Sequence, residues 1–200
     1  NSIIVTPFFV SHSAFDAYMF LIECEGKRIL HTGDFRRHGY LGKGLFPTLK
    51  SYIGTVDLLI IEGTMLGRQQ EQVVTEHQIQ LNTIQALKEH KYIFALCSST
   101  DIDRLASFHA ACKATGRQFL MDSYQRKVLD VFTEYCGNKS SLYKFDHLFE
   151  LQGNKPYRIE KITNYLKDKG FLMPVRMNSS WLIEDMMKVF NRRAKDHVVK

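Results

Sequence analysis

Residues 92–137 read YIFALCSSTDIDRLASFHAACKATGRQFLMDSYQRKVLDVFTEYCG, and this stretch decides the fold class. Residues 92–97 form an apolar run typical of a buried strand, and residues 102–112 repeat apolar side chains at helical spacing. Residues 118–121 and 123–136 repeat the same pair of patterns. A strand and a helix that alternate in this way predict an α/β fold with a doubly wound parallel sheet.

The same alternation continues on both sides of this stretch. Upstream, residues 57–62 are a continuous apolar run that predicts a strand buried on both faces, and residues 73–87 have helical spacing. Downstream, residues 138–156 are polar and irregular. The chain then continues as a helix, a strand and a helix over residues 159–169, 171–177 and 181–194.

The first part of the chain has the pattern of β structure with polar loops. Apolar runs cover residues 3–10 and 18–24, and the turn at residues 25–27 predicts a hairpin into a strand at residues 28–31. Polar loops follow the first and the last of these strands, and such loops commonly carry functional residues.

The composition excludes several classes of protein. With 200 residues, of which 44% are hydrophobic, the chain can bury a core, so a disordered protein is not expected. No apolar run approaches the ~18 residues of a membrane span, and no basic leader precedes the first strand, which predicts a soluble protein of the cytoplasm, or of the nucleus in a eukaryote. The four cysteines have no C-x-x-C spacing, which indicates reduced thiols. No Gly-rich phosphate-binding motif follows a predicted strand.

The excess of positive charge is confined to the last third of the sequence. Residues 1–137 contain 14 Lys and Arg against 14 Asp and Glu, and residues 138–200 contain 13 against 7, which accounts for the whole net charge of +6. A basic region favours binding to the phosphate backbone of RNA or DNA. The same charges also fit the solvated faces of amphipathic helices, so both interpretations stay open.

The loop at residues 11–16, SHSAFD, is the first candidate site. His12 is a candidate metal ligand, because neighbouring hydroxyls and a carboxylate can fix the orientation and tautomer of an imidazole. Ser11, Ser13 and Asp16 are the candidate substrate-binding residues of this loop. A purely structural histidine has the same local pattern and is the alternative.

The loop at residues 31–36, HTGDFR, is the second candidate site. Asp34 follows a glycine at the end of an apolar strand, so its carboxylate can face a cation, and a single carboxylate can bridge two metals. Asp34 is therefore a candidate for both metal binding and catalysis. The alternative is an Asx turn, in which the Asp34 side chain bonds the adjacent backbone.

Glu62 is the third candidate, because it ends the apolar run at residues 57–62 and precedes Gly63. Its carboxylate is expected at the carboxyl end of a strand, where open α/β sheets bind ligands. Glu62 is therefore a candidate catalytic residue. A salt-bridged or helix-capping glutamate is the alternative.

In this order, VSHSAFDAYMFLIECEGKRILHTGDFRRHGY at residues 10–40 and VDLLIIEGTM at residues 56–65 resemble the second half of the metallo-β-lactamase fold and its junction with the β-CASP cap domain. That architecture belongs to the metal-dependent nucleases of the ribonuclease J, 3′-processing and cross-link-repair groups. Residues 93–122 are similar to the first βαβ unit of the cap. The resemblance implies a partial metallo-β-lactamase-like β-sandwich over residues 1–62 and a β-CASP-like, doubly wound parallel-sheet cap over residues 63–200.

The resemblance also implies roles for the three candidates. His12 matches the third metal-ligand motif of the family, Asp34 matches the fourth, which supplies the metal-bridging carboxylate, and Glu62 matches the acidic residue at the start of the cap. A complete site of this kind holds two zinc ions and activates water for hydrolysis of RNA or DNA, here with an exonuclease-like activity. Glu62 would orient a ligating histidine or relay a proton.

Part of the family pattern does not occur in this sequence. The motif H-x-H-x-D-H, which supplies most of the metal ligands, is missing, and neither His147 nor His197 fits the late cap motifs. We expect a fragment that begins after the first metal motif and ends before the last, and a diverged, inactive relative is the other explanation. With at most two of the four or more ligands needed, this chain alone is expected to bind zinc weakly and to lack activity.

Two other functions fit the same sequence. A non-catalytic α/β module that binds a nucleotide or a partner protein would use His12 and Asp34 only structurally. A metallo-hydrolase of the same fold would act on a small ester, lactam or thioester, because a fold does not determine a function. The cap-like region and the basic last third favour the nuclease.

Overall fold

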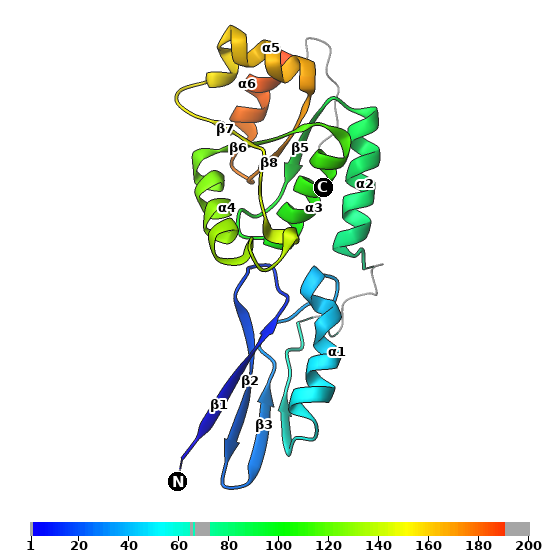
Figure 1. Ribbon diagram of the computed structural model, residues 1–200, viewed down its shortest axis with the longest axis vertical. Helices are drawn as coiled ribbons and strands as arrows, with labels where there is room; N and C mark the ends of the chain where they lie inside the picture. The colour runs from blue at the N-terminus through cyan, green and yellow to red at the C-terminus, as the bar shows by residue number, and fades with distance from the viewer. Residues whose placement is uncertain (1, 65, 67–72, 191–200) are drawn as a thin grey trace. The chain divides into compact units, whose positions relative to one another are not determined.

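The structure is a computed structural model that describes residues 2–64, 66 and 73–190 (Figure 1). The chain divides into two compact units, residues 1–76 and 77–200. Within the described residues, each unit contains one four-stranded sheet with helical segments packed against it. The α/β class predicted from the sequence is confirmed. The domain boundary and the domain identities inferred from the sequence stay predictions.

The first unit is built on a mixed sheet with the strand order β1-β2-β3-β4. Its strands are β1 (Ile4–Val10), β2 (Ala17–Cys24), β3 (Lys27–His31) and β4 (Leu58–Ile60). β1, β2 and β3 pair antiparallel in sequence order, and β4 pairs parallel with β3. The predicted hairpin joins β2 to β3, and Glu25 and Gly26 both have a positive φ, as a two-residue type I′ turn requires.

Short helical segments pack against one face of the first sheet. They are η1 (Tyr40–Gly44), α1 (Leu45–Thr48) and η2 (Leu49–Ile53). Leu45, Leu49 and Ile53 are spaced four residues apart, so they lie on one side of this run and face the sheet. The buried side chains of this core are Val10, Met19, Leu21, Leu30 and Ile53.

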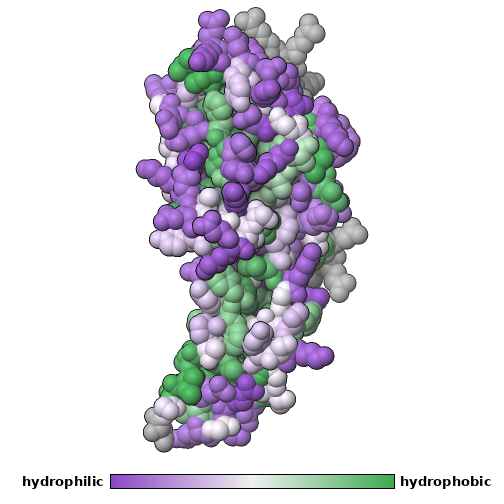
Figure 2. Space-filling view, viewed as in Figure 1, coloured by the Kyte–Doolittle hydropathy of each residue, from purple (hydrophilic) through white to green (hydrophobic). Residues whose placement is uncertain are grey.

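The opposite face of the first sheet is apolar and exposed. Alternation along the strands and the pairing register place one set of large apolar side chains on this face. Its exposed members are Val5, Phe9, Phe20, Leu58 and Ile60. Figure 2 shows the apolar surface over the strands of this unit. A sheet face in contact with water normally carries polar residues, so this apolar face has the character of an interaction surface.

The prediction that residues 57–62 form a strand buried on both faces is wrong. The strand is shorter, and Leu58, Leu59 and Ile60 are 50%, 51% and 44% exposed. β4 lies at the edge of the first sheet, where β3 is its one neighbour among the described strands. An apolar run specifies a strand, but it does not specify which layers cover that strand.

The second unit is built on a fully parallel sheet with the strand order β5-β8-β6-β7. Its strands are β5 (Tyr92–Leu96), β6 (Gln118–Asp122), β7 (Leu148–Leu151) and β8 (Phe171–Val175). Its longer helices are α2 (Glu76–Glu89), α3 (Ile102–Thr115), α4 (Ser123–Cys136), α5 (Glu160–Lys169) and α6 (Ser180–Phe190). Two short turns, η3 and η4, span Ser141–Tyr143 and Pro156–Arg158.

Helices cover both faces of the second sheet, as the doubly wound pattern predicts. α3 and α4 pack against one face, and α5 and α6 pack against the other (Figure 1). On the α5 and α6 side, alternate residues of β8 form the core with Leu166 and Met186. These β8 residues are Phe171, Met173 and Val175. Among the described residues, no helix has both the length and the apolar composition to cross a membrane.

Two differences separate the predicted elements of the second unit from the observed ones. β7 was not predicted, because its four residues lie in a stretch that is otherwise polar and irregular. The helix predicted over residues 181–194 is observed as α6 up to Phe190, and the rest of that prediction lies outside the described residues.

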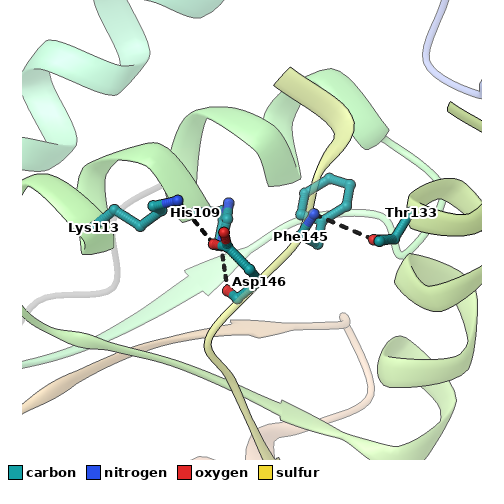
Figure 3. A network of polar contacts seen from close by, with 5 residues as sticks. All are labelled: His109, Lys113, Thr133, Phe145 and Asp146. Atoms are coloured by element: carbon teal, nitrogen blue, oxygen red, sulfur yellow. Dashed lines mark hydrogen bonds and ion pairs between the residues drawn. The ribbon is translucent and has the colours of Figure 1, made fainter. Parts of the chain in front are cut away.

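A partly buried polar network joins α3 to the segment before β7 (Figure 3). The Nε2 atom of His109 lies 2.7 Å from the carbonyl oxygen of Asp146, and the Nζ atom of Lys113 lies 2.8 Å from the Asp146 carboxylate. His109 is only 5% exposed, and its ring contacts those of Phe119 and Phe145. Burial lowers the pKa of His109 by more than the contacts with Asp146 raise it.

We expect the second unit to lose stability as the pH falls below about 6.5, the pKa of an unfolded histidine, because His109 stays neutral in the fold. In that range the unfolded state binds more protons, and one such group costs up to about 1.4 kcal/mol per pH unit. Urea unfolding between about pH 7.5 and about pH 5 measures the slope. The variant His109→Gln keeps an N–H donor without titrating and should flatten it. If His109→Gln leaves the slope of the unfolding free energy against pH unchanged, a group other than His109 takes up the protons.

Candidate metal-binding and catalytic site

The three candidate loops meet because of the topology of the first sheet. β1 and β3 both pair antiparallel with β2, so they run in the same direction, and β4 runs parallel to β3. The carboxyl ends of β1, β3 and β4 therefore lie at one edge of the sheet. The loops that begin at these ends contain His12, Asp34 and Glu62.

Hydrogen bonds join these loops to one another. The backbone N–H of Arg36 donates to the carbonyl oxygen of Ser11 at 2.7 Å, which links the second loop to the first. The backbone N–H of Phe35 donates to the carboxylate of Glu62 at 2.9 Å, which links the second loop to the third. The backbone N–H of Glu62 donates to the hydroxyl oxygen of Thr32 at 3.4 Å. The three loops at this edge therefore form one hydrogen-bonded network.

His12 has a ring nitrogen that is free for a ligand. Its Nδ1 atom lies 3.2 Å from the hydroxyl of Ser13, and its Nε2 atom has no hydrogen-bond partner among the described residues. The side chain is half-buried, so it is both held in place and reachable. Ser11 is 4% exposed, and its backbone carbonyl group accepts the hydrogen bond from Arg36.

Asp34 has a free carboxylate. It is exposed, and it forms no hydrogen bond or ion pair with any residue that the structure describes. The Asx turn that was the alternative for Asp34 is therefore not observed. A carboxylate on a loop that is anchored by its neighbours, with its own oxygens free, is suited to bind a cation.

Glu62 is held as a carboxylate. The N–H of Phe35, then the hydroxyl of Thr64, then the charge of His12 lower the pKa of Glu62, against the opposing effect of burial. A group that is ionised at neutral pH accepts hydrogen bonds and does not donate a proton. The hydrogen bond from Phe35 therefore favours a role for Glu62 in holding the second loop over a proton relay. An ion pair or a helix cap at Glu62 is not observed among the described residues.

Asp16 contacts Tyr18, not His12. The Tyr18 hydroxyl donates to the Asp16 carboxylate at 2.5 Å, and this hydrogen bond raises the pKa of Tyr18. Among the described residues, the hydroxyl of Ser13 is the one side-chain hydrogen-bond partner of the His12 ring. The assignment of Ser11, Ser13 and Asp16 to substrate binding stays a prediction.

The residues that sequence reasoning missed act through backbone N–H and hydroxyl groups. They are Thr32, Phe35 and Thr64. Each lies within two positions of Asp34 or Glu62, and this closeness was the only signal available in the sequence. The contacts of Thr32 and Phe35 with Glu62 depend on the pairing of β3 with β4, whereas Thr64 lies only two residues after Glu62.

Gly33 is required by the shape of the second loop. Its φ is +56°, and a Cβ atom added to it would lie 2.8 Å from the carbonyl oxygen of Tyr18. We expect Gly33→Ala to destabilise the first unit by about 2–3 kcal/mol, because the left-handed backbone strain and the close contact add. Gly26 has a φ of +73° with nothing within 4 Å of an added Cβ, so Gly26→Ala measures the backbone strain alone, about 1 kcal/mol. Urea unfolding compares the two, and equal losses would show that the Tyr18 contact costs nothing.

The described residues supply fewer ligands than a zinc site needs. No group of three or more His, Cys, Asp and Glu side chains is placed to hold a metal within residues 2–64, 66 and 73–190. Imidazole nitrogen and carboxylate oxygen are both zinc ligands, but zinc sites use three or four protein ligands. His12 and Asp34 therefore fit zinc by type, and a complete site requires further ligands.

Comparisons with known proteins address the fold alone. No protein-family model and no curated protein matches the sequence. Among solved structures, the chain is similar to the crystal structure of a protein of unknown function from Enterococcus faecalis V583, with a TM-score of 0.65 and 17% sequence identity. The match covers 90% of this chain and 43% of that one, so this chain spans less than half the length of that protein.

Proposed function

We propose that this chain is part of a metal-dependent phosphodiesterase, a nuclease of the metallo-β-lactamase and β-CASP type. The observation that carries the proposal is that the loops containing His12, Asp34 and Glu62 follow strand ends at one edge of the first sheet and are joined by hydrogen bonds. They come from three different strand ends, in the order that the sequence resemblance implies. His12 and Asp34 both have atoms free to bind a cation.

The exposed apolar face of the first sheet supports a β-sandwich. In a sandwich, a second sheet packs about 10 Å away and buries the inner faces of both sheets. The face that contains Val5, Phe20 and Ile60 has the composition of such an inner face. Helical segments already cover the other side of the sheet, so a second sheet would complete the layers.

The chemistry of the proposed site divides between the metal and the residues of this chain. Bound zinc would lower the pKa of a coordinated water to about 7 and would stabilise the charge that develops on the phosphate. His12 would hold the metal through its imidazole, and Asp34 would hold it through its carboxylate. Glu62 would hold the Asp34 loop through the N–H of Phe35 and would keep His12 oriented through its charge.

The proposed substrate is RNA or DNA, which the basic last third of the chain would contact. That third has 13 basic and 7 acidic residues. Part of its positive charge is used within the fold, because Lys155 and Arg158 both pair with Asp185, and Arg176 pairs with Asp122. These pairs offset part of the positive charge that a phosphate backbone would meet in this third.

The test uses the full-length product of the gene that encodes this segment. We expect it to cleave a labelled single-stranded RNA or DNA, to lose this activity when a chelator removes the metal, and to regain it with added zinc or manganese. A chromogenic lactam and a thioester, assayed in parallel, examine the small-molecule alternative. Failure to cleave either nucleic acid after metal is restored, or cleavage that survives chelation, would contradict the proposal.

A further inference from the structure

The second unit contains a cavity of about 360 Å³ at the carboxyl edge of its parallel sheet. Asp122 ends β6, residues 153–157 follow β7, and residues 176–182 follow β8, and members of all three segments line the cavity. Because β6, β7 and β8 run parallel, their following loops gather at this one edge. The volume lies in the range of roughly 300–1,000 Å³ that is typical of small-molecule sites.

The topology explains why a hollow forms there. β6 and β8 are neighbours in the sheet, yet β6 continues into α4 on one face, whereas β8 continues into α6 on the other. Two adjacent loops that turn away toward opposite faces leave a crevice between them, and open α/β sheets bind ligands in such crevices. All the residues that line this cavity belong to the second unit, whereas His12 and Asp34 belong to the first.

The walls of the cavity combine an aromatic ring with cations that keep free donors. Trp181 is 62% exposed, so its indole offers an open face. The guanidinium of Arg176 donates one N–H to Asp122 at 2.5 Å and lies over the ring of Tyr124, 5.1 Å from its centroid. Its other guanidinium N–H groups meet no oxygen or nitrogen acceptor among the described residues. The Nζ atom of Lys155 lies 3.3 Å from the carboxylate of Asp185, and its side chain is 47% exposed.

Arg176 pairs with Asp122, and Lys155 shares Asp185 with Arg158, so charge alone does not make this cavity a site for any polyanion. The side-chain amides of Asn154 and Asn178 also line it and offer both donors and acceptors. We propose that the cavity binds one nucleoside monophosphate. The base stacks on Trp181 and bonds to the amides, and the phosphate takes the free donors of Arg176 and Lys155.

Trp181 is the single tryptophan of the chain, so its fluorescence reports directly on this cavity. We expect UMP to change the fluorescence of the 200-residue chain saturably, in a buffer that contains a chelator. Arg176→Gln and Lys155→Gln should each raise the Kd about tenfold or more, because each removes a charged donor to the phosphate. Uridine should bind at least about tenfold more weakly than UMP, for the same reason.

Arg126→Gln is the matched control. Arg126 lies on α4, pairs with Asp130 and does not line the cavity, so the same change of charge should leave the Kd for UMP unaltered. Circular dichroism checks that each variant is folded. If Arg176→Gln unfolds because it loses the pair with Asp122, the Kd of Lys155→Gln alone tests the proposal.

Binding of a 5′-phosphorylated oligouridylate shows whether the nucleotide is free or is the end of a strand. Tighter binding than UMP assigns the site to a strand end, and equal or weaker binding assigns it to the free nucleotide.

Three results would overturn the proposal: no saturable change with UMP, a Kd that neither cavity variant alters, or inorganic phosphate that binds as tightly as UMP. The measurement is free of metal, so its failure leaves the nuclease proposal standing. Equally, a full-length protein without nuclease activity would leave the nucleotide cavity standing.

Discussion

Replacing Asp34 with asparagine is expected to lower kcat/KM for nucleic acid by about a thousandfold or more in the full-length protein. The neutral amide is a poor ligand and cannot bridge two cations, so several kcal/mol of transition-state stabilisation are lost, at about 1.4 kcal/mol per factor of ten. Asparagine has nearly the same size, and Asp34 has no hydrogen bond to lose among the described residues. The fold should therefore be unchanged. Initial rates and bound zinc, measured on the same preparation, check this result.

Asp168→Asn is the control for the loss of one negative charge. Asp168 is in α5, its side chain is 74% exposed, and kcat/KM should stay at the parent value. Glu62→Gln should cost less than Asp34→Asn, about 10–100-fold, because Glu62 acts on the site through His12 and the Asp34 loop. If Asp34→Asn retains the parent kcat/KM, the residue is structural, and the non-catalytic module becomes the better interpretation.

Leu120→Ala is expected to destabilise the second unit by about 2–5 kcal/mol, the largest loss of stability among the variants considered. Leu120 is fully buried in β6, which has a strand on each side, and it belongs to the core beneath α5 and α6. Neighbouring strands hold the backbone in place, so the site cannot collapse around the missing atoms, and a cavity remains. Urea unfolding followed by Trp181 fluorescence measures the loss, because Trp181 lies in the same unit.

Leu81→Ala is the matched control for that measurement. Leu81 lies in α2 and is 45% exposed, and alanine is at least as good a helix former as leucine. The substitution should change the free energy of unfolding by less than about 1 kcal/mol. Equal losses in the two variants would mean that Leu120 does not belong to a tightly packed core.

Much of the fold follows from local patterns. The strands and helices from β5 to α4 were predicted within one to three residues of their observed ends, because buried strands and amphipathic helices have different periods that a short window reveals. The hairpin between β2 and β3 was predicted for a related reason, since Gly26 adopts the positive φ of a tight turn without steric cost.

The errors arise where non-local packing decides. β7 is four residues long, and it becomes a strand through pairing with β6, which no local window contains. β4 has the sequence of a doubly buried strand but lies exposed at the edge of the first sheet. The pattern of one segment cannot show which partner it will meet, because that partner is distant in the sequence.

The same division holds for the candidate site. The sequence alone determined which functional groups are available, an imidazole and two carboxylates at the ends of apolar strands. Residue types and local patterns are properties of the sequence itself. Only the tertiary structure decided that they share an edge, that Phe35 binds Glu62, and that the loops after β6, β7 and β8 surround a cavity. The physical reason is that strand direction and pairing are long-range properties, and they set which loops become neighbours.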